Sequence, residues 1–122
     1  MKNETEILRP KYYLDKRGHD LFWQFDHGYY PAVVAIGFCY LNVLKYEKRA
    51  GRKTQDPSED LKKARTYFDE YVKLIEKLDK EEIHDQGLER VLDCSDLKAR
   101  KETFLKRLER IEEDIKSGRA KR

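Results

Sequence analysis

The chain has 122 residues, of which 42% are charged and 39% hydrophobic, and it carries a formal net charge of +3. This length provides for one domain, and the charged share exceeds the usual value of about 25%. The longest apolar run, residues 32–41, is far shorter than the roughly 18 residues of a membrane span, so we expect no segment that crosses a membrane. Cys39 and Cys94 lie far apart without the even spacing of a disulfide framework, which predicts reduced thiols in a cytosolic protein.

An extended arm is expected over residues 1–17, which show no helical period. Pro10 supports this expectation, because a proline disfavours helix at the residue that precedes it. A short helix is expected after Gly18, and Gly28 is expected to stop it, since glycine readily adopts the conformation that ends helices. The apolar side of this helix consists of Leu21, Phe22 and Phe25.

A second helix begins at Pro31, continues to about Ala50 and ends at Gly51. These ends follow the preference for proline at the first helical position and for glycine after the last. Residues 33–44 are apolar on nearly every side of such a helix, which is typical of a helix surrounded by protein. We therefore expect this helix at the centre of the fold.

The third helix has the clearest start signal in the chain. Asp56 is placed to cap it, Pro57 occupies the first helical position, and Glu59 follows three residues after the cap. Apolar residues then recur at spacings of three and four, which predicts one seam about 30 Å long. The seam consists of Leu61, Ala64, Phe68, Tyr71, Ile75 and Leu78.

The last third of the chain predicts a connector and one long helix. The connector, residues 79–94, is ambiguous and suggests one short helix between polar turns. Ser95 is expected to cap a helix over residues 95–118, followed by a frayed tail, 119–122. The apolar seam of this helix packs either within the chain or against a second chain. The sequence thus predicts a single all-α domain: a small helical bundle of about four helices with an extended N-terminal arm and a core in residues 18–78.

Polar side chains interrupt the apolar surface of the second helix. Asn42, Lys45 and Arg49 are spaced by three and four residues, which places them on one face. In a structural interpretation, Asn42 and Arg49 are tied to Asp60 and fix the angle between the second and third helices. In a functional interpretation, basic side chains clasp phosphate oxygens, bidentately where they are arginines. These basic side chains are Lys45, Arg49, Arg52 and Lys53.

Aromatic residues are dense for a chain of this length, with eight tyrosines, five phenylalanines and one tryptophan. At helical spacing most of them are core residues, as we expect of Phe22 and Phe68. Tyr12, Tyr13 and Trp23 are better candidates for stacking on a purine, a contact that contributes about 1–3 kcal/mol per base.

Several familiar catalytic patterns are absent from the sequence. It has no glycine-rich phosphate loop of the GxxxxGK[ST] kind, and its three histidines do not form a metal-binding spacing with either cysteine. No nucleophile lies beside an obvious base, and paired carboxylates that would hold magnesium are not evident. We therefore expect binding rather than turnover, with no catalytic residue, no metal site and no cofactor.

Four segments of the chain resemble a family of small phage proteins that includes a nucleoside monophosphate kinase without a P-loop. The added C-terminal helix is more similar to the phage anti-Thoeris proteins, which sequester cyclic ADP-ribose isomers made by TIR-domain immune enzymes without cleaving them. One departure is Leu41, where many relatives have glycine and where a bulkier residue would narrow a pocket. The segments are Arg9-Pro10-Lys11-Tyr12-Tyr13, Gly18-His19-Asp20-Leu21, Asn42-x-x-Lys45-Tyr46-x-x-Arg49-Ala50-Gly51-Arg52-Lys53 and Glu59-Asp60-Leu61-x-Lys63-Ala64-x-x-Tyr67.

The resemblance implies a viral counter-defence protein that sequesters a cyclic ADP-ribose-type signal in the cytoplasm of the infected bacterial host. It also implies a homo-oligomer, at least a dimer, with ligand pockets at subunit contacts. The resemblance further implies that Arg49 and Arg52 bind the diphosphate and that an aromatic residue stacks on the adenine. The apolar seam of the last helix would form the dimer interface.

Two alternatives remain open. One is a nucleoside monophosphate kinase, in which Asp60 lies near magnesium and the basic cluster holds the phosphate donor. The other is an adaptor that binds RNA or DNA through the basic residues of 45–53 and the tail. Nucleic acid is the less favoured partner, because a local basic cluster suits small anions whereas an extended stripe suits a duplex.

Overall fold

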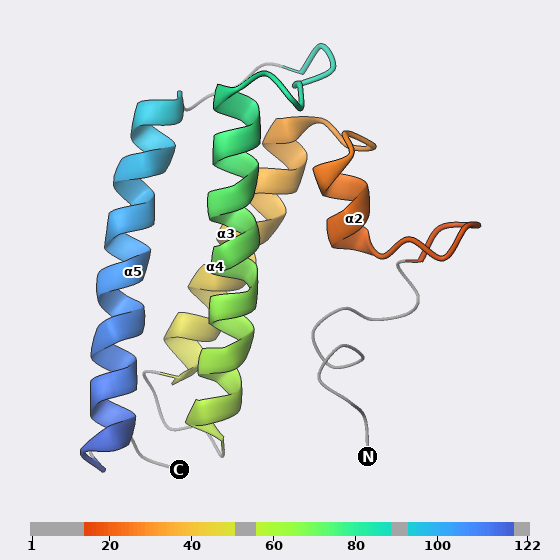
Figure 1. Cartoon of the computed structure of the whole chain (residues 1–122). Coiled ribbons are helices and arrows are strands. Elements are labelled where there is room, and N and C mark those ends of the chain that lie inside the picture. Colours follow the sequence, from red (N-terminus) through yellow and green to blue (C-terminus); the bar gives the residue numbers. More distant parts are fainter. Residues whose placement is uncertain (1–13, 51–55, 89–92, 119–122) are drawn as a thin grey trace.

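The computed structural model describes residues 14–50, 56–88 and 93–118. The three long helices of this part of the chain lie side by side as a bundle, and a short helix lies beside the beginning of α3 (Figure 1). This is the all-α bundle that the sequence predicts, whereas most of the expected arm and the tail lie outside the described residues. The helices are α2 (Leu21–Asp26), α3 (Ala32–Ala50), α4 (Pro57–Asp79) and α5 (Cys94–Lys116), and no strand occurs in the described ranges.

Helix α2 begins and ends where its sequence signals place it. The side chain of Asp20 accepts a hydrogen bond from the backbone N–H of Trp23 at 2.8 Å, which caps the helix. Gly28 follows the helix with a φ of +74°, a conformation that favours glycine. Phe22 and Phe25 are buried, as expected for the apolar side of α2.

Helix α4 also follows its prediction. The side chain of Asp56 accepts from the backbone N–H of Glu59 at 3.0 Å, and Pro57 is the first helical residue. The predicted apolar seam is buried over its whole length, with Tyr71 fully inaccessible to solvent. Burial of a continuous seam is the main source of stability for a helix in a bundle.

Helix α3 is the element on which the sequence prediction is partly wrong. One of its sides is buried at the centre of the fold, where Cys39 and Val43 have no exposed surface. Another side faces solvent, because Leu41 is 64% exposed and Val34 is 44% exposed. In a bundle of three long helices, two neighbours cannot cover every side of the third. One side of α3 therefore remains exposed although its residues there are apolar.

The connector between α4 and α5 forms turns rather than the expected short helix, over its described residues 80–88. Glu81, Gln86 and Gly87 have positive φ values of 60°, 53° and 86°, which interrupt a right-handed helix. Ile83, only 2% exposed, anchors the connector to the core.

Helix α5 is capped by Asp93 instead of the expected Ser95. The Asp93 side chain accepts a hydrogen bond from the backbone N–H of Asp96 at 2.9 Å. The capping residue therefore lies two residues before the predicted one. Aspartate and serine are both favourable caps, and the sequence offered one of each within three residues.

The apolar seam of α5 is buried inside the chain. Phe104 and Leu108 have no exposed surface, and the hydroxyl of Tyr71 on α4 donates to the carbonyl of Leu97 at 3.0 Å. The expectation that this seam forms a dimer is therefore wrong, and the alternative of packing within the chain is confirmed.

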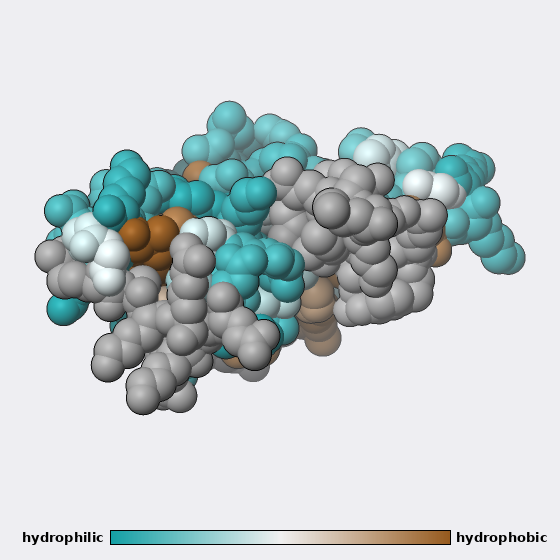
Figure 2. All heavy atoms as spheres, turned by 90° about the horizontal axis from the view of Figure 1, so that it is seen from below, coloured by the Kyte–Doolittle hydropathy of each residue, from teal (hydrophilic) through white to brown (hydrophobic). Residues whose placement is uncertain are grey.

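The end of the bundle where α3 ends and α4 begins is mostly hydrophilic at its surface. Seen from below, the coloured residues are predominantly teal, with brown residues among them (Figure 2). None of the helices in the described part combines the length and apolarity that a membrane crossing requires. Neither Cys39 nor Cys94 forms a disulfide within the described part of the chain.

Candidate functional site

The second half of α3 and the first half of α4 share a face on which basic side chains surround one tyrosine ring. Three cationic groups lie near the centre of the Tyr46 ring: the Lys45 Nζ at 4.5 Å, the Lys63 Nζ at 5.4 Å and the Arg49 Cζ at 5.8 Å. Cations at such distances are attracted to the negative face of an aromatic ring. We define the Tyr46 cluster as Lys45, Tyr46, Arg49, Asp60, Lys63 and Tyr67.

The ring of Tyr46 is fixed by the contact between α3 and α4. It lies parallel to the ring of Tyr67, with 5.9 Å between centroids and 8° between planes. Tyr67, only 8% exposed, has Phe22 at 5.6 Å and Phe38 at 5.9 Å in edge contacts. The cluster is thus built on an aromatic platform that continues into the core.

Two of the cations in the cluster also contact carboxylates. The Nε of Arg49 lies 3.5 Å from Oδ1 of Asp60, which is 3% exposed. The Nζ of Lys63 lies 3.5 Å from Oε1 of Glu59, one helical turn away. The Arg49–Asp60 link expected in the structural interpretation is therefore present. The Arg49 side chain is nevertheless 57% exposed, and a guanidinium has five N–H donors, so this contact leaves donors directed to solvent.

Asn42 lies one turn before the cluster and is half-buried. Its side-chain amide donates to the backbone carbonyl of Phe38 at 2.9 Å, within α3. Leu41 points outward, so in this chain it narrows no pocket between α3 and α4. The other expected ligand residues, Tyr12, Tyr13, Arg52 and Lys53, lie outside the described residues.

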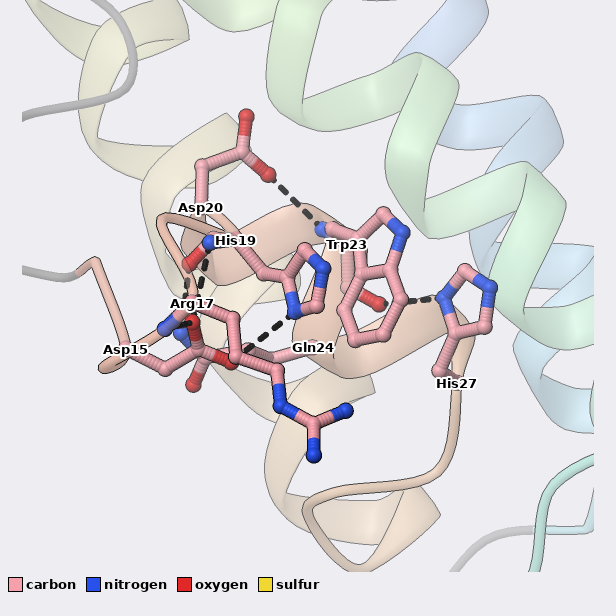
Figure 3. A network of polar contacts seen from close by, with 7 residues as sticks. All are labelled: Asp15, Arg17, His19, Asp20, Trp23, Gln24 and His27. Atoms are coloured by element: carbon pink, nitrogen blue, oxygen red, sulfur yellow. Dashed lines mark hydrogen bonds and ion pairs between the residues drawn. The ribbon is translucent and has the colours of Figure 1, made fainter.

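Trp23 of α2 lies between the rings of His19, which precedes the helix, and His27, which follows it (Figure 3). His19 stacks on one face at 3.5 Å between centroids and His27 on the other at 3.7 Å, each tilted by 14°. The His19 ring also contacts Asp15, with Nδ1 and Oδ2 3.1 Å apart. Because both faces of the indole are covered, a purine would have to displace an imidazole to stack there. Helix α2 lies beside the beginning of α3, whereas the Tyr46 cluster belongs to the second half of that helix (Figure 1).

A cavity beside α3 lies on another side of the helix from Lys45 and Arg49. A cavity of about 580 Å³ lies between α3 and α5, lined in part by Glu47, Lys48 and Arg107. Lys45 and Arg49 are not among its lining residues. The Tyr46 cluster and this cavity therefore occupy different faces of α3.

Sequence reasoning missed a partly buried ionic group between α2 and α4. Lys73 Nζ lies 3.1 Å from Oδ2 of Asp26 and 3.4 Å from Oε1 of Glu70, which is 3% exposed. Burial, and then the hydrogen bond and charge of Asp26, raise the pKa of Glu70 well above its ordinary range. Burial, followed by the charges of Glu70 and Asp26, also raises the pKa of the Cys39 thiol. Because their pKa values are raised, the Cys39 thiol and the Glu70 carboxyl keep their protons more readily than usual. This fits a structural role for the group.

The sequence carried signals for the missed members of the Tyr46 cluster. Lys63 and Tyr67 are spaced by four residues on the third helix, and Tyr46 adjoins Lys45. Only the structure shows that these two helix faces meet. Within the described ranges, no group of three or more His, Cys, Asp or Glu side chains is arranged to hold a metal ion.

A family model described as a protein of unknown function, DUF3310, matches residues 7–69, about half of the chain. No curated protein and no solved structure matches. The matched range includes all six residues of the Tyr46 cluster and ends before α5.

Proposed function

The chain belongs to the DUF3310 family of proteins of unknown function, and we propose that it binds and sequesters a nucleotide signal of the cyclic ADP-ribose type without cleaving it. In this proposal it acts as a viral counter-defence protein in the cytoplasm of an infected bacterium. The single observation that carries the proposal is the convergence of Lys45, Arg49 and Lys63 on the ring of Tyr46.

The charge of the Tyr46 cluster favours an anion with several phosphate oxygens. Three cations on one ring repel one another, and an anion placed between them relieves that repulsion. Asp60 and Glu59 offset part of the charge, but Lys45 has no carboxylate within ion-pair distance among residues 14–50, 56–88 and 93–118. A diphosphate suits this set, because an arginine binds it bidentately while lysines act as point charges.

The remaining ligand contacts are proposed from the resemblance. Arg52 and Lys53 follow α3 in the sequence after Gly51 and would extend the basic surface toward the diphosphate. Tyr12 or Tyr13 would cover the adenine, since the Trp23 ring is occupied on both faces. Sequestration requires nanomolar affinity, about −12 kcal/mol, which phosphate contacts and base stacking together have to supply.

The proposal still includes a dimer, but its interface is the exposed side of α3 instead of the apolar seam of α5 that the resemblance implied. Val34 and Leu41 are seven residues apart on α3, so they lie on the same side, and both are exposed. Lys45 continues this side one turn further on. A second copy that covers Val34 and Leu41 would bring two Tyr46 clusters close together and enclose ligand at the subunit contact.

The direct test is recovery of ligand from the complex. The full chain is incubated with a cyclic ADP-ribose isomer, separated from free ligand, denatured and analysed by mass spectrometry. The proposal predicts that ligand of unchanged mass and chromatographic position is released in a fixed ratio to protein. Release of a linear or hydrolysed product, or of no nucleotide, contradicts it.

A second candidate function is favoured by the buried carboxylate of Asp60 beside Arg49. In a nucleoside monophosphate kinase, this carboxylate would lie near magnesium and the basic cluster would hold the donor phosphates. That function predicts formation of ADP from ATP and a nucleoside monophosphate, lost in Asp60→Asn. Sequestration predicts no such product.

A further inference from the structure

The groove between α3 and α5, with a volume of about 580 Å³, opens on the side of the bundle that α4 does not cover. All of its lining residues come from α3 and α5. Both of these helices pack on α4, where the ring of Tyr71 contacts Tyr40 of α3 and Phe104 of α5. On α5 the lining residues extend over 100–114, which is about 21 Å at 1.5 Å per residue. The α5 wall of the groove is therefore about four helical turns long.

The floor of the groove is apolar and is held in place by the core. Tyr40 and Leu44 are four residues apart on one face of α3 and are half-buried, and Ile111 of α5 is 8% exposed. The ring of Tyr40 lies against the buried ring of Phe104, with 5.2 Å between centroids. A partner that covers the accessible parts of this floor would remove further apolar surface from water, which favours association.

The rim of the groove carries more positive than negative charge. Its cationic side chains are Lys48 on α3 and Arg100, Arg107 and Arg110 on α5, and its carboxylate is that of Asp114. Within the described ranges, no carboxylate lies at ion-pair distance from Lys48, Arg100 or Arg110. Arg107 and Arg110 are neighbours on one face of α5 and repel each other. An acidic partner would relieve this repulsion.

The carboxyl group at the base of the groove offsets this charge only weakly. Glu47 is 4% exposed, and neither of its oxygens has a hydrogen-bond partner in the described part of the chain. Its Oε1 lies 3.8 Å from Nη1 of Arg107, which is too long for a hydrogen bond. Burial raises the pKa of Glu47 to about 7, against the effect of the Arg107 charge, so near neutral pH much of this group is protonated. Arg107, with a side chain that is 48% exposed, therefore keeps donors for an acidic group from outside.

We propose that this groove binds an amphipathic helix of a partner protein, with its apolar stripe on the floor and its Asp or Glu side chains on the cationic rim. Such a helix contacts a groove through residues at positions i, i+3, i+4 and i+7. It would take the place of the fourth helix in a four-helix bundle. An acidic helix is favoured over a polynucleotide, because the cations border an apolar floor instead of forming an extended basic stripe. The groove lies on a different face of α3 from the Tyr46 cluster, so the proposal stands whether or not that cluster binds a nucleotide.

The test measures the binding of two synthetic helical peptides of about 15 residues to the full chain by fluorescence anisotropy. Both peptides carry the same leucine stripe, and the positions that flank it are Glu in one peptide and Lys in the other. We expect the Glu peptide to bind about tenfold or more tightly than the Lys peptide, because like charges suppress association. Arg110→Glu should weaken the Glu peptide by about fivefold or more. Lys101→Glu makes the same change of charge at an α5 residue that does not line the groove, and it should have an effect of about twofold at most.

NMR of methyl groups in the wild-type chain locates the bound peptide without any substitution. On addition of the Glu peptide, the methyl signals of Leu44 and Ile111 in the groove should shift. Those of Val34 and Leu41, on the exposed side of α3, should not. Shifts that fall on Val34 and Leu41 instead would place the peptide on another surface and overturn the proposal.

The binding measurements can overturn the proposal in further ways. It fails if the Glu peptide does not bind, if it binds no more tightly than the Lys peptide, or if Lys101→Glu weakens it as much as Arg110→Glu does. Displacement of the Glu peptide by an equal concentration of single-stranded oligouridylate would assign the groove to nucleic acid. Dissociation of a wild-type oligomer by Arg110→Glu would assign it to a second copy of the chain, and either result contradicts the proposal.

Discussion

Tyr46 of α3 and Tyr67 of α4 lie face to face, 5.9 Å apart between ring centroids and 8° from parallel. The ring that Lys45, Arg49 and Lys63 approach is therefore held by the contact between two helices. Tyr67 in turn contacts the core through Phe22 and Phe38. The geometry of the cluster thus depends on the core packing of the bundle, which gives several consequences that can be measured.

Removal of the Tyr46 ring is expected to destabilise the fold. Tyr46→Ala should lower the free energy of unfolding by about 1–3 kcal/mol, because it removes buried aromatic surface and the stack on Tyr67. Tyr46→Phe keeps the ring and should cost less than about 0.5 kcal/mol. Urea denaturation of the two variants checks this, and equal losses in both would show that the hydroxyl matters rather than the stack.

Arg49→Ala is expected to separate ligand binding from stability. The Arg49 side chain is 57% exposed, so the loss of its ion pair should lower the free energy of unfolding by less than about 1 kcal/mol. Binding of a diphosphate nucleotide should fall by about tenfold or more, since a charge-assisted bidentate contact is lost. Lys98→Ala is the matched control, because it removes an exposed ion pair, to Asp79, at the other end of α4. A stability loss in Arg49→Ala well above that of the control would favour the structural interpretation of this residue.

Phe104→Ala tests whether the seam of α5 belongs to one chain. Phe104 has no exposed surface and packs against Tyr40 and Tyr71, so its truncation should cost about 3–5 kcal/mol. The loss should not depend on protein concentration, because the contact lies within the chain. A melting temperature of the wild-type protein that rises with concentration and loses this dependence in Phe104→Ala would contradict the intrachain seam.

The pH dependence of stability should carry a contribution from Glu47. Burial raises the pKa of Glu47 from its ordinary value of 4.5 to about 7, against the opposing effect of the Arg107 charge. Between these two pH values the unfolded chain has released the proton while the folded chain still holds it. The contribution of Glu47 to the free energy of unfolding is therefore fully present below the lower of these pH values. It falls as the pH rises toward the higher one, by up to roughly 3 kcal/mol.

Comparison with Glu47→Gln isolates this contribution, because Glu70 is shifted in the same direction. The free energy of unfolding of both proteins is measured at about pH 4.5 and about pH 7.5. The variant should gain stability relative to the wild type at the higher pH. An equal pH dependence in the two proteins would show that Glu47 ionises normally in the folded state.

Most of the fold could be predicted from local signals. The capping aspartate and proline at Asp56 and Pro57 fixed the start of α4, and its apolar spacing identified the buried side. The open side of α3 could not be predicted, because an apolar residue such as Leu41 has the same local pattern whether or not another element covers it. The cap of α5 was missed because Asp93 and Ser95 both carry the chemistry of a cap.

The site could be predicted only in part, for a related reason. Helical spacing placed Lys45 and Arg49 on one face and suggested Asp60 as a partner, and the Arg49–Asp60 contact is present. Spacing along one helix cannot show which face of another helix lies opposite, so the approach of Lys63 to Tyr46 needed the structure. The same limitation hid the groove at Glu47, whose arginines come from α5.

The central claim is that the Tyr46 cluster binds the phosphates of a cyclic ADP-ribose-type nucleotide, and calorimetric titration of one such isomer tests it most directly. We predict binding of the wild-type chain in the nanomolar range, about −12 kcal/mol. Lys45→Ala combined with Arg49→Ala should weaken binding by about a hundredfold or more, and Glu47→Gln should leave it unchanged. Absence of binding to the wild type, or equal affinity of the double variant and the wild type, would contradict the claim.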